Sequence, residues 1–200
     1  MTDARPSSSH PRRVGGDGDI EVFISDEQND VALDLARWQK LAQEVLRAEG
    51  VRGACELTVM FIDASTMTEM NKQYMGKAYA TDVLSFPIDA VEATRTPGPG
   101  AMSKCPEPSP LDMSDLPLLL GDVVICPSVA SAQAPRHAGN IDDEIALLLV
   151  HGILHVLGND HDTPDTQSAM HALERKHLEA LHWGHSTPVG FRHIQEVDNS

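Results

Sequence analysis

HGILHVLGNDH, residues 151–161, decides how the centre of this chain folds. His151 and His155 stand four residues apart, so on a helix they lie one turn apart on one face and can reach a common metal ion. Gly158 can take the left-handed conformation that ends a helix, after which the chain turns and His161 approaches. Three imidazoles with a fourth position left for water are typical of a catalytic zinc site. The segment therefore predicts one zinc ion bound by these three histidines.

The residue after the first histidine distinguishes two kinds of enzyme. Metzincin proteases share this spacing in the form H-E-x-x-H-x-x-G-x-x-H, and their glutamate is the general base. Gly152 has no side chain that could take a proton, so the sequence disfavours a conventional metalloprotease. A core histidine would account for His155 alone, but not for three histidines at ligand spacing.

Length and charge limit the class of protein. At 200 residues and 41% hydrophobic composition, the chain is long enough for one well-buried core and short for two. The formal net charge of −15 argues against broad adhesion to nucleic acid or to anionic membranes, although a local basic groove remains compatible with it.

The cysteines and the apolar runs indicate the compartment. Cys55, Cys105 and Cys126 are odd in number and irregularly spaced, which indicates neither a disulfide framework nor a second zinc site. The sequence contains no apolar run of 18 residues and no apolar stretch after the N-terminal arginines. We therefore expect a cytoplasmic protein without a membrane span or a signal peptide.

Hydrophobic periodicity predicts the order of the elements. The expected strands cover 20–25, 56–63, 81–86 and 118–126. The expected helices cover 30–49, capped by Asp30; 65–75, starting at Ser65; a short one from Pro127; 141–157; and 163–182. Strand 56–63 carries apolar residues on both faces, which is typical of a fully buried strand. The order lacks a clean βαβ repetition, so the predicted fold is α+β, with a single mixed β-sheet covered by helices.

The ends and one internal stretch fall outside this pattern. Residues 1–18 are rich in Ser, Pro, Gly and Arg and are expected to be a disordered tail. Six of the thirteen prolines lie in 90–117, which we interpret as a surface insert. The predicted domain is 19–185, followed by a polar C-terminal tail, 186–200.

Three blocks give the chain a recognisable resemblance. They are ATDVLSFP at 80–87, LLGDVVIC at 119–126 and HGILHVLGNDH at 151–161. In this order they resemble the YbeY family of single-strand-specific metallo-endoribonucleases, over most of residues 20–182. The resemblance implies a zincin-like metal helix, one Zn²⁺ on the three histidines, maturation of the 16S rRNA 3′ end and a role in ribosome quality control. The expected partners are single-stranded rRNA and the ribosome or its proteins, with neither DNA nor a membrane among them.

One residue departs from the family pattern. Many relatives carry an arginine after the tyrosine of N-x-x-Y, whereas this chain reads NKQYMGK and has Met75 there. Methionine cannot hold a phosphate, and Lys77 offers a point charge rather than a bidentate guanidinium. The departure bears on the strength of nuclease activity and leaves open a non-catalytic alternative, a ribosome-assembly factor with a structural zinc.

Other candidate residues carry weaker signals. Asp82 and Asp160 could accept a proton or support a ligand histidine, but strand-end and helix-end turns explain them equally well, so no catalytic residue is assigned. Candidates for RNA contact are the cations Lys72, Lys77 and Arg136, with His137, and the aromatic residues Tyr74, Tyr79 and Phe86. The histidines expected on the surface are His171, His177, His182 and His185.

Overall fold

Four strands form one mixed sheet in the computed structural model, which describes residues 20–88, 117–159 and 161–193. They are β1 (Ile20–Glu27), β2 (Cys55–Ile62), β3 (Val83–Pro87) and β4 (Leu118–Ile125). The sheet order is β1-β2-β4-β3; β1, β2 and β4 run parallel, and β3 lies antiparallel to β4. This mixed sheet with its helices confirms the predicted α+β fold.

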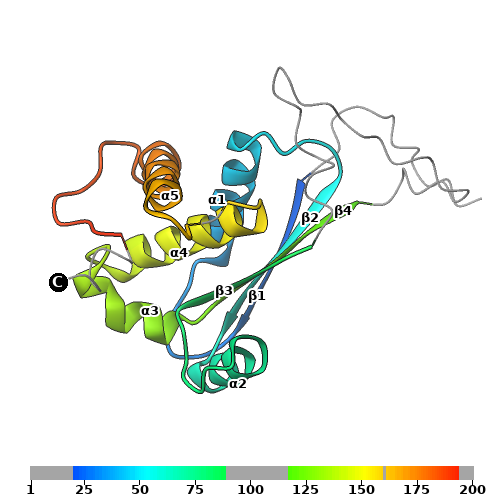
Figure 1. The fold of residues 1–200 in the computed structure, drawn as a ribbon, viewed down its shortest axis with the longest axis vertical. Helices are drawn as coiled ribbons and strands as arrows, with labels where there is room; N and C mark the ends of the chain where they lie inside the picture. The colour runs from blue at the N-terminus through cyan, green and yellow to red at the C-terminus, as the bar shows by residue number, and fades with distance from the viewer. Residues whose placement is uncertain (1–19, 89–116, 160, 194–200) are drawn as a thin grey trace, which may run out of the picture.

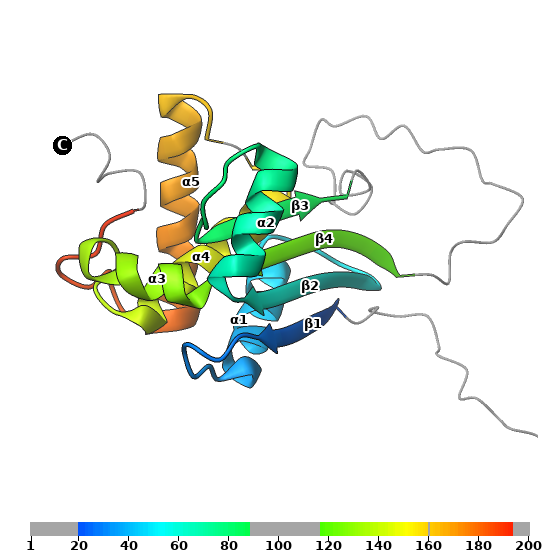
Figure 2. The ribbon, with the colours of Figure 1, turned by 90° about the horizontal axis from the view of Figure 1, so that it is seen from below.

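The helices cover both faces of the sheet (Figures 1 and 2). They are α1 (Leu35–Ala48), α2 (Ala64–Met75), α3 (Pro127–Gln133), the 3-10 turn η3 (Ala134–Arg136), α4 (Ile141–Val156), α5 (Pro164–His177) and the π-helical turn η4 (Leu178–Trp183). In Figure 1, α1 and α4 lie on one side of the sheet with α5 above α4, and α2 lies on the other side. Within the described residues, no helix is long and apolar enough to cross a bilayer.

Two apolar clusters pack against the sheet, one on each face. The larger joins α1 and α4 to strand residues such as Val59 and Val123, and the smaller places Met67 of α2 against Leu84 and Val124. Successive residues of a strand point to opposite faces, so neighbouring Val123 and Val124 belong to different clusters. Strand β2 lies between β1 and β4 and is covered on both faces, as its apolar pattern predicted.

Helix α1 begins later than predicted, and α2 begins within one residue of its predicted start. Asp34, not Asp30, caps α1, because the Gln28 side chain holds the N–H groups of Asp30 and Val31 at 2.7 and 2.9 Å in a separate turn. The cap of α2 is Asp63, whose carboxylate accepts two backbone N–H groups at 2.8 Å each, so the helix starts at Ala64, one residue before Ser65. The hydrogen bonds of Asp63 also hold the pKa of its carboxyl below the usual value.

The prediction that His177 and His182 lie on the surface is wrong. His177 Nε2 lies 2.7 Å from Glu49 Oε1, and His182 Nε2 lies 2.7 Å from Asp143 Oδ1. Both side chains are almost fully buried. Carboxylates from the end of α1 and the start of α4 supply the partners that make this burial tolerable, and a pattern read along one helix does not reveal them.

Several predicted segments lie outside the described residues: the tail 1–18, all but the last residue of the insert 90–117, Asp160, and the end of the predicted tail, 194–200. The part of that tail up to residue 193 packs on the domain, where Phe191 contacts the ring of Trp183.

Candidate metal centre

Helix α4 carries two of the three histidines at its C-terminal end. Asn140 caps its first turn by accepting the Asp143 N–H at 2.9 Å. Apolar residues bury this helix almost all round, so its position against the sheet is closely fixed. His151 and His155 are on the last turns and are only half-buried. The helix therefore holds two imidazoles rigidly at the edge of the core.

Gly152 allows α4 to lie close to the sheet. A Cβ atom at this position would lie 2.6 Å from Val123 Cγ1 and 3.2 Å from Ser85 Oγ. Both distances are shorter than ordinary van der Waals contact. Even the first carbon of a side chain would push the helix off β3 and β4, so a glutamate in the metzincin position does not fit this backbone.

The end of α4 turns the chain back toward its own last turn. Gly158 has φ of 80°, the left-handed conformation predicted for it. Its N–H donates to His155 O at 2.8 Å, and the N–H of Asn159 donates to Leu154 O at 2.9 Å. These two bonds form the Schellman motif that commonly ends a helix at glycine. The reversal places His161 beside the two helical histidines.

The structure brings the three predicted ligands together. The Nε2 atoms of His151 and His155 lie 3.1 Å apart, and the ring of His161 has its centroid 5.5 Å and 4.9 Å from theirs. One ligand atom from each residue lies within 4.8 Å of the other two. Two ligands at about 2.05 Å on a tetrahedral ion are roughly 3.3 Å apart, close to the Nε2 separation found here. The arrangement can therefore hold a metal ion.

Glu174 of α5 is the residue that sequence reasoning missed. Its Oε1 accepts the His151 Nδ1–H at 2.7 Å, and its Oε2 lies 2.7 Å from His193 Nδ1. Burial by itself raises the pKa of Glu174, but the hydrogen bonds and charges of the two histidines outweigh it and lower the pKa to about 2. The signal in the sequence was a carboxylate between Met170 and Leu178 on the inward face of the last helix.

The other polar candidates lie in supporting roles. Asp82 is 8% exposed and accepts the Val83 N–H at 2.8 Å, as a strand-start turn requires. His137 is also 8% exposed, with Nδ1 3.1 Å from Glu144 Oε1, so it is not available to a phosphate. Burial raises the pKa of Glu144, although its hydrogen bonds to Ala138 and His137 oppose the rise.

The candidates for RNA contact stand mostly at the surface. Tyr74 and Tyr79 are more than half exposed, and Tyr74 meets the partly buried ring of Phe86 at 4.9 Å and 65°. Met75 is 57% exposed at the end of α2. The three candidate cations, Lys72, Lys77 and Arg136, are all exposed.

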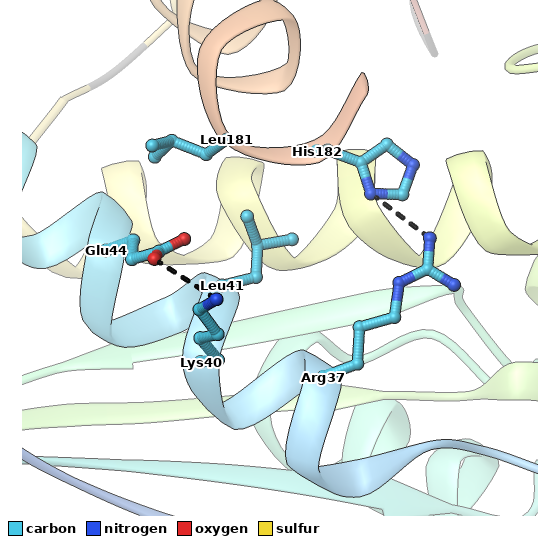
Figure 3. A pocket seen from close by; sticks show the side chains of 6 residues that line it. All are labelled: Arg37, Lys40, Leu41, Glu44, Leu181 and His182. Atoms are coloured by element: carbon cyan, nitrogen blue, oxygen red, sulfur yellow. Dashed lines mark hydrogen bonds and ion pairs between the residues drawn. The ribbon is translucent and has the colours of Figure 1, made fainter. Parts of the chain in front are cut away.

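A pocket of about 240 Å³ lies at the other end of α4, between α1 and η4 (Figure 3). Its lining residues are Arg37, Lys40, Leu41, Glu44, Leu181 and His182. None belongs to the histidine cluster, and Arg37 and His182 already pair with the aspartates of the first turn of α4. We therefore place the candidate site at the histidines.

Comparison with known proteins identifies the family. The model of the family described as endoribonuclease YbeY matches residues 23–182. The chain belongs to the endoribonuclease YbeY family. An endoribonuclease YbeY of Thermobifida fusca is 39% identical over 159 residues, covering 80% of this chain and 92% of the relative. One from Mycobacterium sp. (strain KMS) is 37% identical over 153 residues, covering 76% and 79%.

A solved structure supports the fold of this chain. The solution structure of TM1509 from Thermotoga maritima aligns with a TM-score of 0.53 at 21% identity, over 82% of this chain and 90% of that one. At this identity the likeness shows a shared fold. The resemblance drawn from the three sequence blocks is confirmed by the family match.

Proposed function

We propose that this chain is a zinc-dependent endoribonuclease that cleaves single-stranded RNA during late rRNA processing, at the 3′ end of 16S rRNA, and acts in ribosome quality control. His151, His155 and His161 are the proposed ligands of one Zn²⁺, with α4 as a zincin-like metal helix. The observation that carries the proposal is the convergence of three half-buried imidazoles in a chain of the YbeY family. Imidazole nitrogens suit zinc, although they also accept nickel, copper and iron.

A bound ion and the protein residues around it would have different roles in hydrolysis. Zinc supplies Lewis-acid activation of water and of a phosphoryl oxygen. Glu174 orients His151 by accepting its Nδ1–H, so that the Nε2 lone pair stays available to the metal. Because the three histidines are only half-buried, we propose that a substrate strand reaches the cluster from solvent.

Exposed aromatic and basic side chains favour a single-stranded substrate. Tyr74 and Tyr79 present open rings, on which unpaired bases can stack. Lys72 lies on α2, as Tyr74 does, and Lys77 lies in the loop after this helix. Both lysines can contact backbone phosphates of the same strand. A duplex would keep its bases stacked away from such rings, so we propose that these side chains hold a single strand.

Peptide hydrolysis of the metzincin type is not supported. Gly152 offers no general base, and the spacing to Val123 leaves no room for a side chain there. The remaining alternative is a non-catalytic, zinc-stabilised ribosome-assembly factor. Its specific support is Met75, an exposed thioether where many relatives carry a cation.

Cleavage of a labelled single-stranded RNA by the zinc-loaded protein tests the proposal. His155→Ala removes a ligand, and His185→Ala is the matched control because His185 is exposed and lies outside the cluster. We expect cleavage by the wild type and the control and none by His155→Ala. Equal cleavage by all three proteins, or none by any, would support the assembly factor, and co-sedimentation with small ribosomal subunits would then be measured.

A further inference from the structure

The chain segment after η4 returns to the domain and buries a histidine. The Arg192 N–H donates to the His137 carbonyl at 3.0 Å, and Phe191 packs edge-on against Trp183, with centroids 5.1 Å apart. These contacts bring His193 to the inner face of α5, where it is 1% exposed. His193 lies beyond the residues that match the family model, 23–182.

The buried ring of His193 has a partner on each side. Its Nδ1 lies 2.7 Å from Glu174 Oε2, and its Nε2 lies 3.4 Å from a guanidinium nitrogen of Arg175. His171 stacks on the ring at 4.0 Å, with the two planes 4° apart. Burying an imidazole without hydrogen bonds costs free energy. Here both ring nitrogens of His193 have a hydrogen-bond partner.

The donors around this ring decide which nitrogen carries its proton. A guanidinium can only donate, so Nε2 of His193 accepts from Arg175 and the proton lies on Nδ1. That Nδ1–H donates to Glu174 Oε2, which leaves Oε1 to accept the Nδ1–H of His151. The free lone pair of His151 is then on Nε2, the atom 3.1 Å from Nε2 of His155.

We propose that His193 is a positioning residue for the metal ligand His151, acting through Glu174. It fixes the Glu174 carboxylate, and the carboxylate in turn fixes the tautomer and ring orientation of His151. For the identity of the ion, this inference rests on the proposed function. The hydrogen bonds from His193 to Glu174 and from His151 to Glu174 form without the ion, so they can be measured in the metal-free protein. The segment after the family-matched residues thereby becomes part of the metal centre.

The same residues could be mistaken for a second metal site. One ligand atom each from His171, Glu174 and His193 lies within 4.8 Å of the others. However, the lone pairs of an imidazole lie in the ring plane, so two parallel stacked rings do not direct them at one point. The Arg175 guanidinium beside His193 also repels a cation. We therefore assign the cluster to hydrogen bonding and expect one zinc ion per chain.

The tautomers of the wild-type protein test the assignment directly. Long-range ¹H–¹⁵N spectra of the histidine rings distinguish Nδ1–H from Nε2–H, and they can be recorded at pH 8.5 with and without zinc. We expect Nδ1–H for both His151 and His193 in the zinc-free protein. An Nε2–H form at either residue overturns the proposal. Absence of zinc binding by the wild type would count against the proposed function while leaving this result readable.

Substitutions then measure what His193 does for the metal. Zinc affinity is determined by competition with a chromophoric chelator, and native mass spectrometry counts the ions. His193→Leu removes the donor and His193→Asn keeps an amide N–H near the position of Nδ1, while His185→Leu is the matched control on the same segment.

We expect zinc affinity to fall about tenfold in His193→Leu, to stay within roughly threefold in His193→Asn, and to be unchanged in the control. Wild-type affinity in a folded His193→Leu, or two zinc ions per wild-type chain, overturns the proposal. If His193→Leu does not fold, His193→Asn and the wild-type spectra decide.

Discussion

Replacing Gly152 by alanine tests whether the approach of α4 to the sheet is as close as the structure shows. The added Cβ would lie 2.6 Å from Val123 Cγ1, whereas ordinary carbon contacts are at about 3.5–4.0 Å, so roughly 1 Å must be opened. Val123 is fully buried in β4 and cannot move aside freely. Overpacking of this kind costs about 1–3 kcal/mol, and alanine recovers up to about 1 kcal/mol of helix propensity. We expect a net loss of about 1–2 kcal/mol.

A double-mutant cycle with Val123→Ala isolates the contact. Val123→Ala alone should cost about 2 kcal/mol for its lost methyl groups. In the double variant the space left by those methyl groups accepts the new Cβ, so the loss should fall short of the sum by at least about 1 kcal/mol. The free energy of unfolding is measured for the zinc-free proteins by urea denaturation, with unchanged m-values as the check on two-state behaviour. Losses that add within about 0.3 kcal/mol would refute the reasoning.

Three further outcomes follow from the same structure. Burial raises the pKa of Glu144 in the folded protein. The stability linked to this carboxyl is therefore fully present below its usual, unfolded-state pKa and is lost as pH rises through its raised, folded-state pKa. Glu144→Gln should make the free energy of unfolding, measured by urea denaturation, fall less steeply over that pH range. Zinc affinity should drop between pH 7.5 and 5, because a histidine ligand must be neutral, and an unchanged affinity would contradict the three-histidine site. Cys55 is 1% exposed and burial raises the pKa of its thiol, so iodoacetamide should label it only after unfolding, as mass spectrometry would show.

The sequence predicted those features whose cause is local. The spacing of His151 and His155 on a helix, and a glycine that ends it, depend on residues within one turn of each other, so their placement could be reasoned without a fold. The strands of the sheet were found for the same reason, since their apolar patterns report burial directly. The start of α2 was predicted to within one residue. The start of α1 was misplaced because several Asp residues compete to cap that helix, and the Gln28 side chain decides the competition by holding the N–H groups of Asp30 and Val31.

The features that sequence reasoning missed depend on segments far apart in the chain. Glu174 lies 23 residues after His151, and its role requires that α5 pack on α4 with that side chain inward. His177 and His182 are buried where they meet the carboxylates of Glu49, just after α1, and Asp143 of α4, and no periodicity within the last helix indicates these contacts. The one local sign of a buried partner was Glu174 itself, a charged residue on the apolar face of the last helix, because such a residue is rarely buried without a partner.

Gly152 links the fold of this chain to its chemistry. In a metzincin the glutamate at this position supplies the base, and a helix bearing it must stand far enough from the sheet to admit the side chain. Here α4 lies so close to Val123 that no side chain fits, and the support for the site comes from the opposite side, where Glu174 of α5 holds His151. The single absent side chain thus removes the protease base and lets α4 pack tightly against the sheet. The proposed hydrolysis of a phosphodiester by a metal-activated water, which relies on the ion more than on a protein base, is compatible with this arrangement.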